Sequence, residues 1–205
     1  MERANLRTIV LASASPRRKE LLHKLNIPVY TIPANIDEAT TIDCPGKRVE
    51  ELSIRKAEAI YTRIQMNAQE RQRFEKSIIV GADTIVVKNA QVLGKPASPQ
   101  EAIEMLTLLS GDVHEVYSGI AMIDCLTKAR LTAHRRTKVT FRSLTKQQIE
   151  RYVNTREPMD KAGAYGIQGL GAFFVDSIEG CYFNVVGLSL SLFGKMITKF
   201  GVEVV

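Results

Sequence analysis

The chain has 205 residues, of which 45% are hydrophobic and 24% are charged, and 28 Lys and Arg residues against 22 Asp and Glu give a net charge of +6. This composition excludes a disordered tail, a collagen-like fibre and a disulfide scaffold, and the length suits one domain or two small lobes that share a cleft. The positive charges are dispersed, aromatic residues make up 6% and Trp is absent. We therefore do not expect a base-stacking nucleic-acid surface, and a basic cleft for a small polyphosphate explains the charge equally well.

Hydrophobic periodicity predicts alternating strands and helices. The apolar run 8–12 is interpreted as a buried strand, and Ser15 and Pro16 as the N-cap and first position of a helix. In chain order we then predict a strand at 29–32, a helical stretch at 45–75, strands at 77–80 and 84–87, a helix at 99–109, strands at 113–124 and 128–141, a helix at 145–154, a Gly-rich segment at 163–171, a strand at 172–178 and a helix at 186–200. This order is typical of an α/β fold with a mixed sheet.

The cysteines Cys44, Cys125 and Cys181 are odd in number and have no CxxC spacing, and the three His residues form no zinc-binding pattern. Reduced thiols in a cytosolic chain fit this usage. No apolar run approaches the roughly 18 residues of a membrane span, and the apolar stretch 9–12 is too short for a signal peptide. We therefore predict a cytoplasmic protein with no membrane segment.

Residues 13–18 join a predicted strand to a predicted helix and carry two hydroxyls and two guanidiniums. The N–H groups and positive dipole at a helix N-terminus favour an anion, and the guanidiniums of Arg17 and Arg18 suit phosphate oxygens. Ser13 and Ser15 supply hydroxyl donors to the same point. An ordinary capped helix with two solvated arginines is an equally good interpretation of this segment alone.

A carboxylate, Asp83, lies between the apolar runs 77–80 and 84–87. Asp is depleted in strands, so Asp83 needs a hydrogen bond, an ion pair or a metal ion. Mg²⁺ takes one or two carboxylates together with substrate phosphates, and Asp37 and Glu38 form a second acidic pair that completes such a site. The ordinary alternatives are a turn-capping Asp83 and a solvated loop at 37–38.

Lys56 and Lys95 are informative only if both face one cleft, because each is otherwise a surface lysine. Gln168 lies among three glycines in residues 160–169, where the backbone must turn tightly or approach a ligand closely. Its amide donates and accepts at once, as contact with a nucleobase edge requires.

Taken together, these residues resemble the Maf (septum formation protein) family of nucleotide pyrophosphatases. The matching blocks follow the family's order and cover nearly the whole chain. They are residues 11–18, 37–38, 55–57, 81–84, 94–96, 109–111, 160–169 and 184–188. The residues at 81–84 and 166–169 resemble the branch that acts on dTTP and UTP.

The resemblance implies one domain over residues 1–205 with an ITPase-like α/β fold, an elongated mixed sheet flanked by helices, with two lobes around a central cleft. It also implies an enzyme that hydrolyses dTTP and UTP, with modified pyrimidine nucleotides as further candidate substrates, to the monophosphate and diphosphate, and so limits incorporation of non-canonical nucleotides. The implied cofactor is a divalent cation, Mg²⁺ or Mn²⁺, and the implied assembly is a homodimer.

The same resemblance assigns roles to individual residues. Asp83 is the proton acceptor, and Glu38 and Asp83 hold the metal. The triphosphate is bound by Ser13, Arg18, Lys56 and Lys95. The base is selected by Arg17, Thr84 and Gln168.

Two alternatives stay open: a pyrophosphatase for 7-methyl-GTP or a broader set of modified nucleotides, and a regulator that binds nucleic acid or a division partner. Steep loss of affinity with salt would mark nucleic-acid binding. One residue departs from the family pattern, because Ser189 stands where the family usually has Pro. We expect Ser189 to affect entry into the last helix rather than the cleft.

Overall fold

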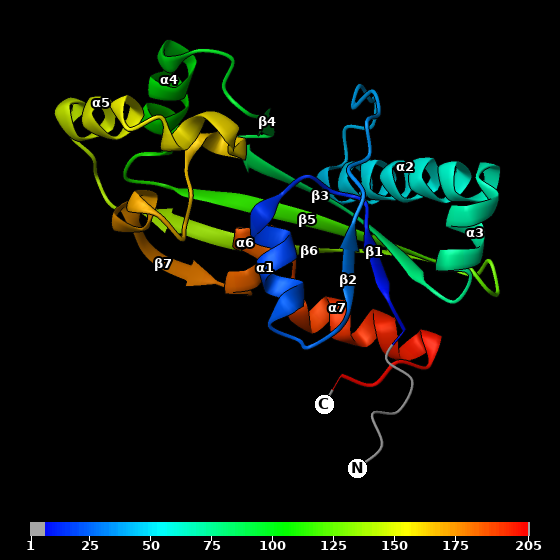
Figure 1. Ribbon diagram of the computed structural model, residues 1–205. Helices are drawn as coiled ribbons and strands as arrows, with labels where there is room; N and C mark the ends of the chain where they lie inside the picture. Colours follow the sequence, from blue (N-terminus) through cyan, green and yellow to red (C-terminus); the bar gives the residue numbers. More distant parts are fainter. Residues whose placement is uncertain (1–6, 205) are drawn as a thin grey trace. The chain divides into compact units, whose positions relative to one another are not determined.

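The computed structural model describes residues 7–204, in which strands and helices alternate (Figure 1). The strands are β1 (Ile9–Leu11), β2 (Val29–Thr31), β3 (Ile78–Lys88), β4 (Gln91–Leu93), β5 (Val113–Asp124), β6 (Arg130–Phe141) and β7 (Val175–Glu179). They form one sheet in the order β2-β1-β3-β5-β6-β7, with β4 paired to β3. Because β1 is parallel to β2 and β3 while β4 and β7 pair antiparallel, the predicted mixed α/β class is confirmed.

The helices are α1 (Pro16–His23), α2 (Pro45–Met66), α3 (Ala68–Phe74), α4 (Pro99–Leu109), α5 (Lys146–Asn154), α6 (Tyr182–Val186) and α7 (Leu190–Ile197). Short 3₁₀ turns are η1 (Glu157–Asp160), η2 (Ala162–Ala164), η3 (Leu170–Phe174) and η4 (Thr198–Phe200). Among the described residues, no helix is long and apolar enough to cross a membrane.

The chain divides into two compact units. The first contains residues up to Asp83, 118–135 and the segment from Gly187 onward, and the second contains 84–117 and 136–186. Three of the boundaries fall inside β3, β5 and β6, and the fourth directly follows α6. The prediction of one domain over residues 1–205 stays a prediction.

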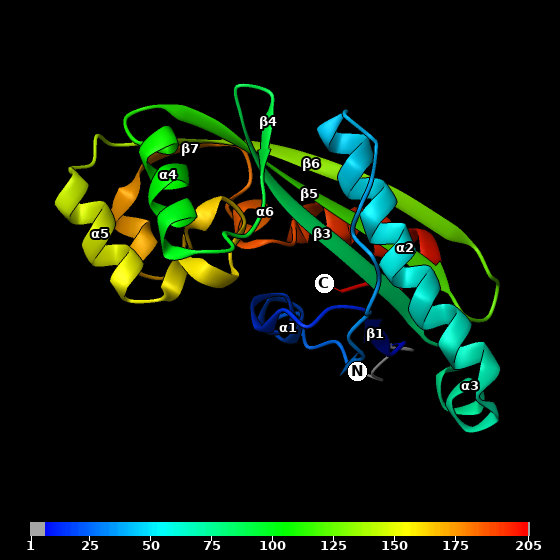
Figure 2. The same cartoon turned by 90° about the horizontal axis from the view of Figure 1, so that it is seen from above.

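The core of the first unit lies between the sheet and α2. Val10, Ile79 and Ala121 project from β1, β3 and β5 toward Ala57 and Ile60 of α2, and all five are at most 3% exposed. The 22-residue helix presents its apolar residues at helical spacing to this face, and all of its charged residues except the buried Lys56 are at least partly exposed. Helices α1 and α7 lie on the opposite face of the strands (Figures 1 and 2).

The second unit has an aromatic core. Phe141 contacts the rings of His114, Tyr165 and Phe174 at 4.8, 4.8 and 6.0 Å between centroids, and Tyr152 contacts Phe174 at 4.8 Å. All are edge-to-face or near it, the arrangement that the ring quadrupoles favour. Helices α4 and α5 pack against one another in this unit.

One prediction is wrong at the centre of the sheet. Residues 81–83 do not separate two strands, because β3 runs without interruption from Ile78 to Lys88. Gly81, Ala82 and Asp83 are all buried in extended backbone. Asp83 is therefore not a turn residue but a carboxylate within a buried strand.

Three other boundaries differ from the prediction. The helical stretch 45–75 is broken at Asn67, whose side chain accepts the Gln69 and Glu70 N–H groups and caps α3. The strand expected at 172–178 begins only at Val175, after the 3₁₀ turn η3. The last helix is split, and Ser189 begins α7 by accepting the Leu192 N–H at 3.4 Å, which agrees with the role expected for Ser189 at helix entry.

Candidate active site

The segment between β1 and α1 is organised by the Ser13 hydroxyl. Ser13 is buried, and its Oγ accepts hydrogen bonds from the Ser15 N–H at 3.2 Å and from the Arg18 guanidinium at 3.1 Å. Ser15 is the N-cap residue of α1, as predicted, but its own side chain makes no capping hydrogen bond. The loop is therefore closed by a hydroxyl two residues earlier than the cap.

Arg18 ties this segment to two other parts of the first unit. Its guanidinium donates to the carbonyl of Ala82 in β3 at 2.9 Å and to that of Gly187 at 2.9 Å. Burial lowers the pKa of Arg18, and the carboxylate of Asp83 opposes that shift. The guanidinium of Arg18 thus binds the residue that precedes Asp83 in β3, and main-chain acceptors fix its orientation.

Lys56 joins the two carboxylates that the sequence analysis singled out. Its Nζ lies 2.6 Å from Asp83 Oδ1 and 2.8 Å from Glu38 Oε1. The side chains of Lys56 and Asp83 are 10% and 9% exposed, whereas that of Glu38 is 59% exposed. A buried ion pair is therefore joined to a solvent-facing carboxylate through one ammonium group.

A glycine allows α2 to lie close enough to β3 for this contact. A Cβ built on Gly81 would collide with the carbonyl oxygen of Ser53 and approach the amide of Ala57 within 2.9 Å. Both are backbone atoms of α2, so the clash could not be relieved by rotating a side chain. The absence of a side chain at Gly81 brings the Lys56 turn of α2 onto the strand that carries Asp83.

Arg55 holds the loop that carries Glu38. Its guanidinium donates to the carbonyl oxygens of Asp37 and of Ala39, the latter at 3.0 Å, and it pairs with Glu51 one turn earlier on α2 at 3.2 Å. The two loop carbonyls flank Glu38. The sequence motif that contains Arg55 gives it no role, because the loop carbonyls that it binds are main-chain atoms and leave no pattern in the sequence.

The remaining candidates do not all belong to this constellation. Arg17 is half-buried in the first turn of α1, in the first unit. The other three belong to the second unit: Thr84 is half-buried in β3, and Lys95 and Gln168 are exposed in loops.

The two carboxylates have the chemistry of a divalent-cation site. Glu38 and Asp83 converge on the cationic Nζ of Lys56, so the site already accommodates a positive charge between them. Oxygen ligands from one or two carboxylates suit Mg²⁺ when phosphates and waters complete the shell. Over residues 7–204, no group of three or more His, Cys, Asp or Glu side chains could hold a metal ion. The donor set therefore fits a cation that the substrate helps to bind.

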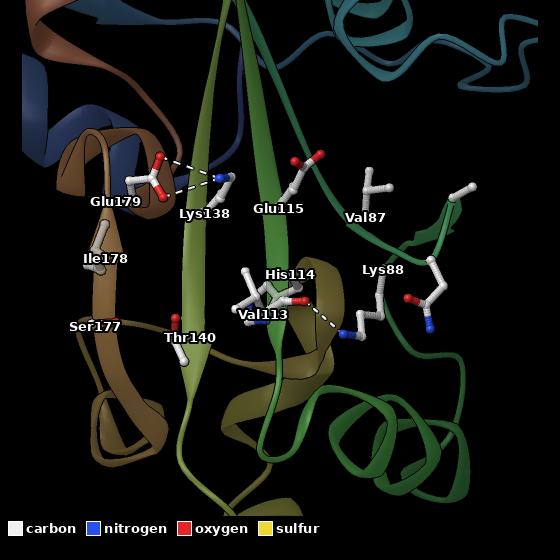
Figure 3. Close-up of a pocket in the computed structure, with 12 residues that line it drawn as sticks. Val87, Lys88, Val113, His114, Glu115, Lys138, Thr140, Ser177, Ile178 and Glu179 are labelled. Atoms are coloured by element: carbon white, nitrogen blue, oxygen red, sulfur yellow. Dashed lines mark hydrogen bonds and ion pairs between the residues drawn. The ribbon is translucent and has the colours of Figure 1, made fainter.

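A pocket of about 540 Å³ in the second unit has a different character (Figure 3). It is lined by residues of β3, β5, β6 and β7, and none of the candidate residues lines it. Lys88 lies 2.5 Å from Asp112 and donates to the carbonyl of Val113 at 2.8 Å, while Lys138 pairs with Glu179 at 3.2 Å. Each lysine is thus paired with a carboxylate, and the pocket is separate from the residues that the sequence motifs singled out.

Comparison with known proteins decides the family. Residues 8–200 match the family described as Maf-like protein. The chain belongs to the Maf-like family. The resemblance recognised in the sequence motifs is thereby confirmed over nearly the whole chain.

Three full-length relatives have curated names, and the names are the same. The dTTP/UTP pyrophosphatase of Desulforamulus reducens is 47% identical over 98% of this chain and 100% of its own, and that of Moorella thermoacetica is 48% identical over 96% of both chains. The dTTP/UTP pyrophosphatase of Pelotomaculum thermopropionicum is 44% identical over 97% of this chain and all of its own. Among solved structures, the Ham1 protein of Staphylococcus aureus matches with 15% identity over 66% of this chain and 72% of its own, at a TM-score of 0.43 that carries no further conclusion.

All nine candidate residues of this Maf-like chain fall within the matched range 8–200. Six of them lie in the first unit, where contacts link Ser13 to Arg18 and Lys56 to Glu38 and Asp83. The match concerns the family, and the role of each residue stays a prediction.

Proposed function

We propose that this chain is a nucleoside triphosphate pyrophosphatase that hydrolyses dTTP and UTP to the monophosphate and diphosphate. Full-length relatives at 44–48% identity carry the name dTTP/UTP pyrophosphatase. The observation that carries the chemistry is the contact of Lys56 with the buried Asp83 and the exposed Glu38. A binding protein has no need of two carboxylates held on one ammonium beside the half-buried Arg18.

In the proposed reaction, water attacks a phosphorus of the triphosphate and the diphosphate leaves. Asp83 accepts the proton of the attacking water, for which a carboxylate held in place by Lys56 is suitably oriented. Ser13, Arg18 and Lys95 bind phosphate oxygens, and Lys56 neutralises charge on both the carboxylates and the polyanion. Arg17, Thr84 and Gln168 discriminate between bases.

A divalent cation, Mg²⁺ or Mn²⁺, belongs to this proposal, with Glu38 and Asp83 as its protein ligands. When bound, it supplies neutralisation of the phosphate charge and a lowered pKa for its water. The carboxylates of Glu38 and Asp83 hold it from the protein side, and Arg55 keeps Glu38 within reach by fixing residues 37 and 39.

The test is diphosphate release by the purified chain with Mg²⁺ or Mn²⁺. The panel contains the natural ribo- and deoxyribonucleoside triphosphates, 7-methyl-GTP and modified pyrimidine triphosphates. We expect turnover of dTTP and UTP, and its loss in Asp83→Asn by at least about a hundredfold, the lower range for removal of a general base. An Asp83→Asn variant that keeps most of its activity contradicts the assignment of the base.

The same panel separates the alternatives. Turnover of 7-methyl-GTP alone would keep the chemistry and reject the base-selecting roles of Arg17, Thr84 and Gln168. No turnover of any nucleotide would favour a regulator that binds nucleic acid or a division partner.

Three sequence predictions accompany this proposal and stay predictions. They are a homodimeric assembly, a cytoplasmic location and a role in limiting incorporation of non-canonical nucleotides. Nucleic acid is not proposed as a partner, because the chain's basic residues are dispersed and its aromatic content is 6%.

A further inference from the structure

Gln168 lies at the tip of a tight turn in the second unit. The Gly169 N–H donates to the carbonyl of Gly166 at 3.2 Å, which closes the turn around Ile167 and Gln168. Ile167 is 8% exposed and points into the unit, whereas Gln168 is exposed. The turn therefore presents the Gln168 amide to solvent, while the neighbouring Ile167 side chain is buried in the unit.

Two side chains tie both ends of this turn to the body of the unit. Before the turn, the Gly166 N–H donates to Tyr152 Oη at 3.1 Å. After it, the N–H groups of Leu170 and Gly171 donate to the two carboxylate oxygens of Glu157 at 2.9 and 3.2 Å. The Tyr152 hydroxyl in turn donates to Glu157 Oε1 at 2.9 Å, so that the two anchors form one network.

The glycines of the loop fit this network closely. A Cβ on Gly169 would collide with the carboxylate of Glu157, and a Cβ on Gly171 would come within 2.8 Å of Tyr152 Oη. Glu157 is an acceptor only, so its carboxylate suits a loop that presents two N–H groups and a hydroxyl. Burial raises the pKa of Tyr152 well above its usual value, and the hydroxyl thus remains a donor at neutral pH.

We propose that Glu157 is a positioning residue for base selection, holding Gln168 through hydrogen bonds to the N–H groups of Leu170 and Gly171 and through Tyr152. The inference rests on the proposed function, because it gives Gln168 the task of contacting the nucleobase. Glu157 itself does not touch the substrate in this scheme. Its effect is on which base is accepted, and not on the attack at phosphorus.

Glu157→Gln is the first test, because it keeps the size of the side chain but replaces one acceptor oxygen with a donor group. That NH₂ faces either Leu170 N–H or the pair formed by Gly171 and Tyr152, and one anchor is lost. We expect the ratio of kcat/KM for dTTP to that for GTP to fall about tenfold, the effect of losing one hydrogen bond to a charged group. Glu150→Gln is the matched control, since Glu150 pairs only loosely with Lys146 on α5 at 3.7 Å, and it should leave the ratio unchanged.

A double-mutant cycle distinguishes positioning from a general structural role. If Glu157 acts through Gln168, then Glu157→Gln changes the dTTP-to-GTP ratio in the wild-type background and has no further effect on it in Gln168→Ala. Tyr152→Phe serves as a second variant: it keeps the ring on Phe174, removes the Gly166 anchor and should lower the same ratio. Hydrogen exchange at the amides of residues 166–171 should be faster in both variants, whatever their activity.

Several results overturn the proposal. An equal loss of kcat/KM for every nucleotide, or the same change of ratio in the Gln168→Ala background, would refute a positioning role for Glu157. Unchanged exchange at residues 170 and 171 in Glu157→Gln would refute the anchoring itself. A wild-type chain that releases no diphosphate from any nucleotide would refute the proposed function, whereas an active wild type with an unaltered Glu157→Gln variant refutes this inference alone.

Discussion

Replacing Lys56 by Met should destabilise the protein strongly. The substitution removes the ammonium that lies 2.6 Å from Asp83 and 2.8 Å from Glu38, and it keeps an apolar side chain of similar length. Asp83, with a side chain 9% exposed, then becomes a buried carboxylate without its cation. Breaking a buried pair in this way costs about 3–5 kcal/mol. Glu38 adds little to the loss, because its exposed carboxylate is solvated by water.

For a chain of this size, such a loss lowers Tm by roughly 6–20 °C, at about 2–4 °C per kcal/mol. Thermal unfolding followed by circular dichroism at pH 7 measures it. Lys47→Met is the matched control on the same helix: Lys47 is 68% exposed and pairs with Glu50 at 2.9 Å, and its loss should leave Tm unchanged.

The pair also predicts a specific non-additivity. In the single variant Asp83→Asn, Lys56 keeps Glu38 as its partner. In the double variant the buried carboxylate is removed together with its cation, so no unpaired buried charge is left. Lys56→Met combined with Asp83→Asn should therefore be more stable than Lys56→Met alone. A Lys56→Met variant that melts within about 2 °C of the wild type, or a double variant no better than the single one, would refute the reasoning.

Three further predictions concern packing and pH. Gly81→Ala should lower the stability by about 1–3 kcal/mol, because the added Cβ meets the backbone of Ser53, and a wild-type Tm would contradict that close approach. Burial lowers the pKa of His114 to about 4 from 6.5. The free energy of unfolding that neutral His114 contributes is therefore complete above about pH 6.5 and falls by about 3 kcal/mol as the pH decreases to 4. Urea unfolding should show this pH dependence of stability in the wild type and not in His114→Gln. The Arg7 hydrogen bonds lower the pKa of Asp124 to about 2 from 3.8, so about 2 kcal/mol of stability is present above about pH 4 and lost toward pH 2. Asp124→Asn should be less stable than the wild type at pH 7, and the two stabilities should converge near pH 2. Parallel curves of stability against pH would exclude the ion pair as the cause.

The sequence pattern predicts the order of elements well, because most strands and helices have a clear hydrophobic period. It fails at residues 81–83, where Gly and Asp are ordinarily turn residues. In this chain the glycine serves the close approach of α2, and the aspartate is neutralised by Lys56 from the same helix. Both compensations come from residues of α2, where Lys56 lies 27 positions before Asp83, and a local window does not include them.

The site could be predicted in part for a related reason. Asp83, Glu38 and Lys56 carry chemistry in their side chains, so their types and spacing indicate a function before any contact is known. The structure adds that the three meet at one ammonium group. It also gives Arg18 a more structural part than expected, because its guanidinium is held by Ser13 and by main-chain carbonyls.

Arg55 and Glu157 could not be found in this way, because the loop atoms they hold belong to the main chain. Every residue offers an N–H or a carbonyl group, so the sequence contains no mark of which ones Arg55 and Glu157 will reach. Yet each residue fixes a loop that carries a predicted functional side chain, Glu38 in one case and Gln168 in the other. Substituting either residue should therefore displace Glu38 or Gln168 without removing any group that contacts the nucleotide. Motif reasoning alone would class both Arg55 and Glu157 as surface charges.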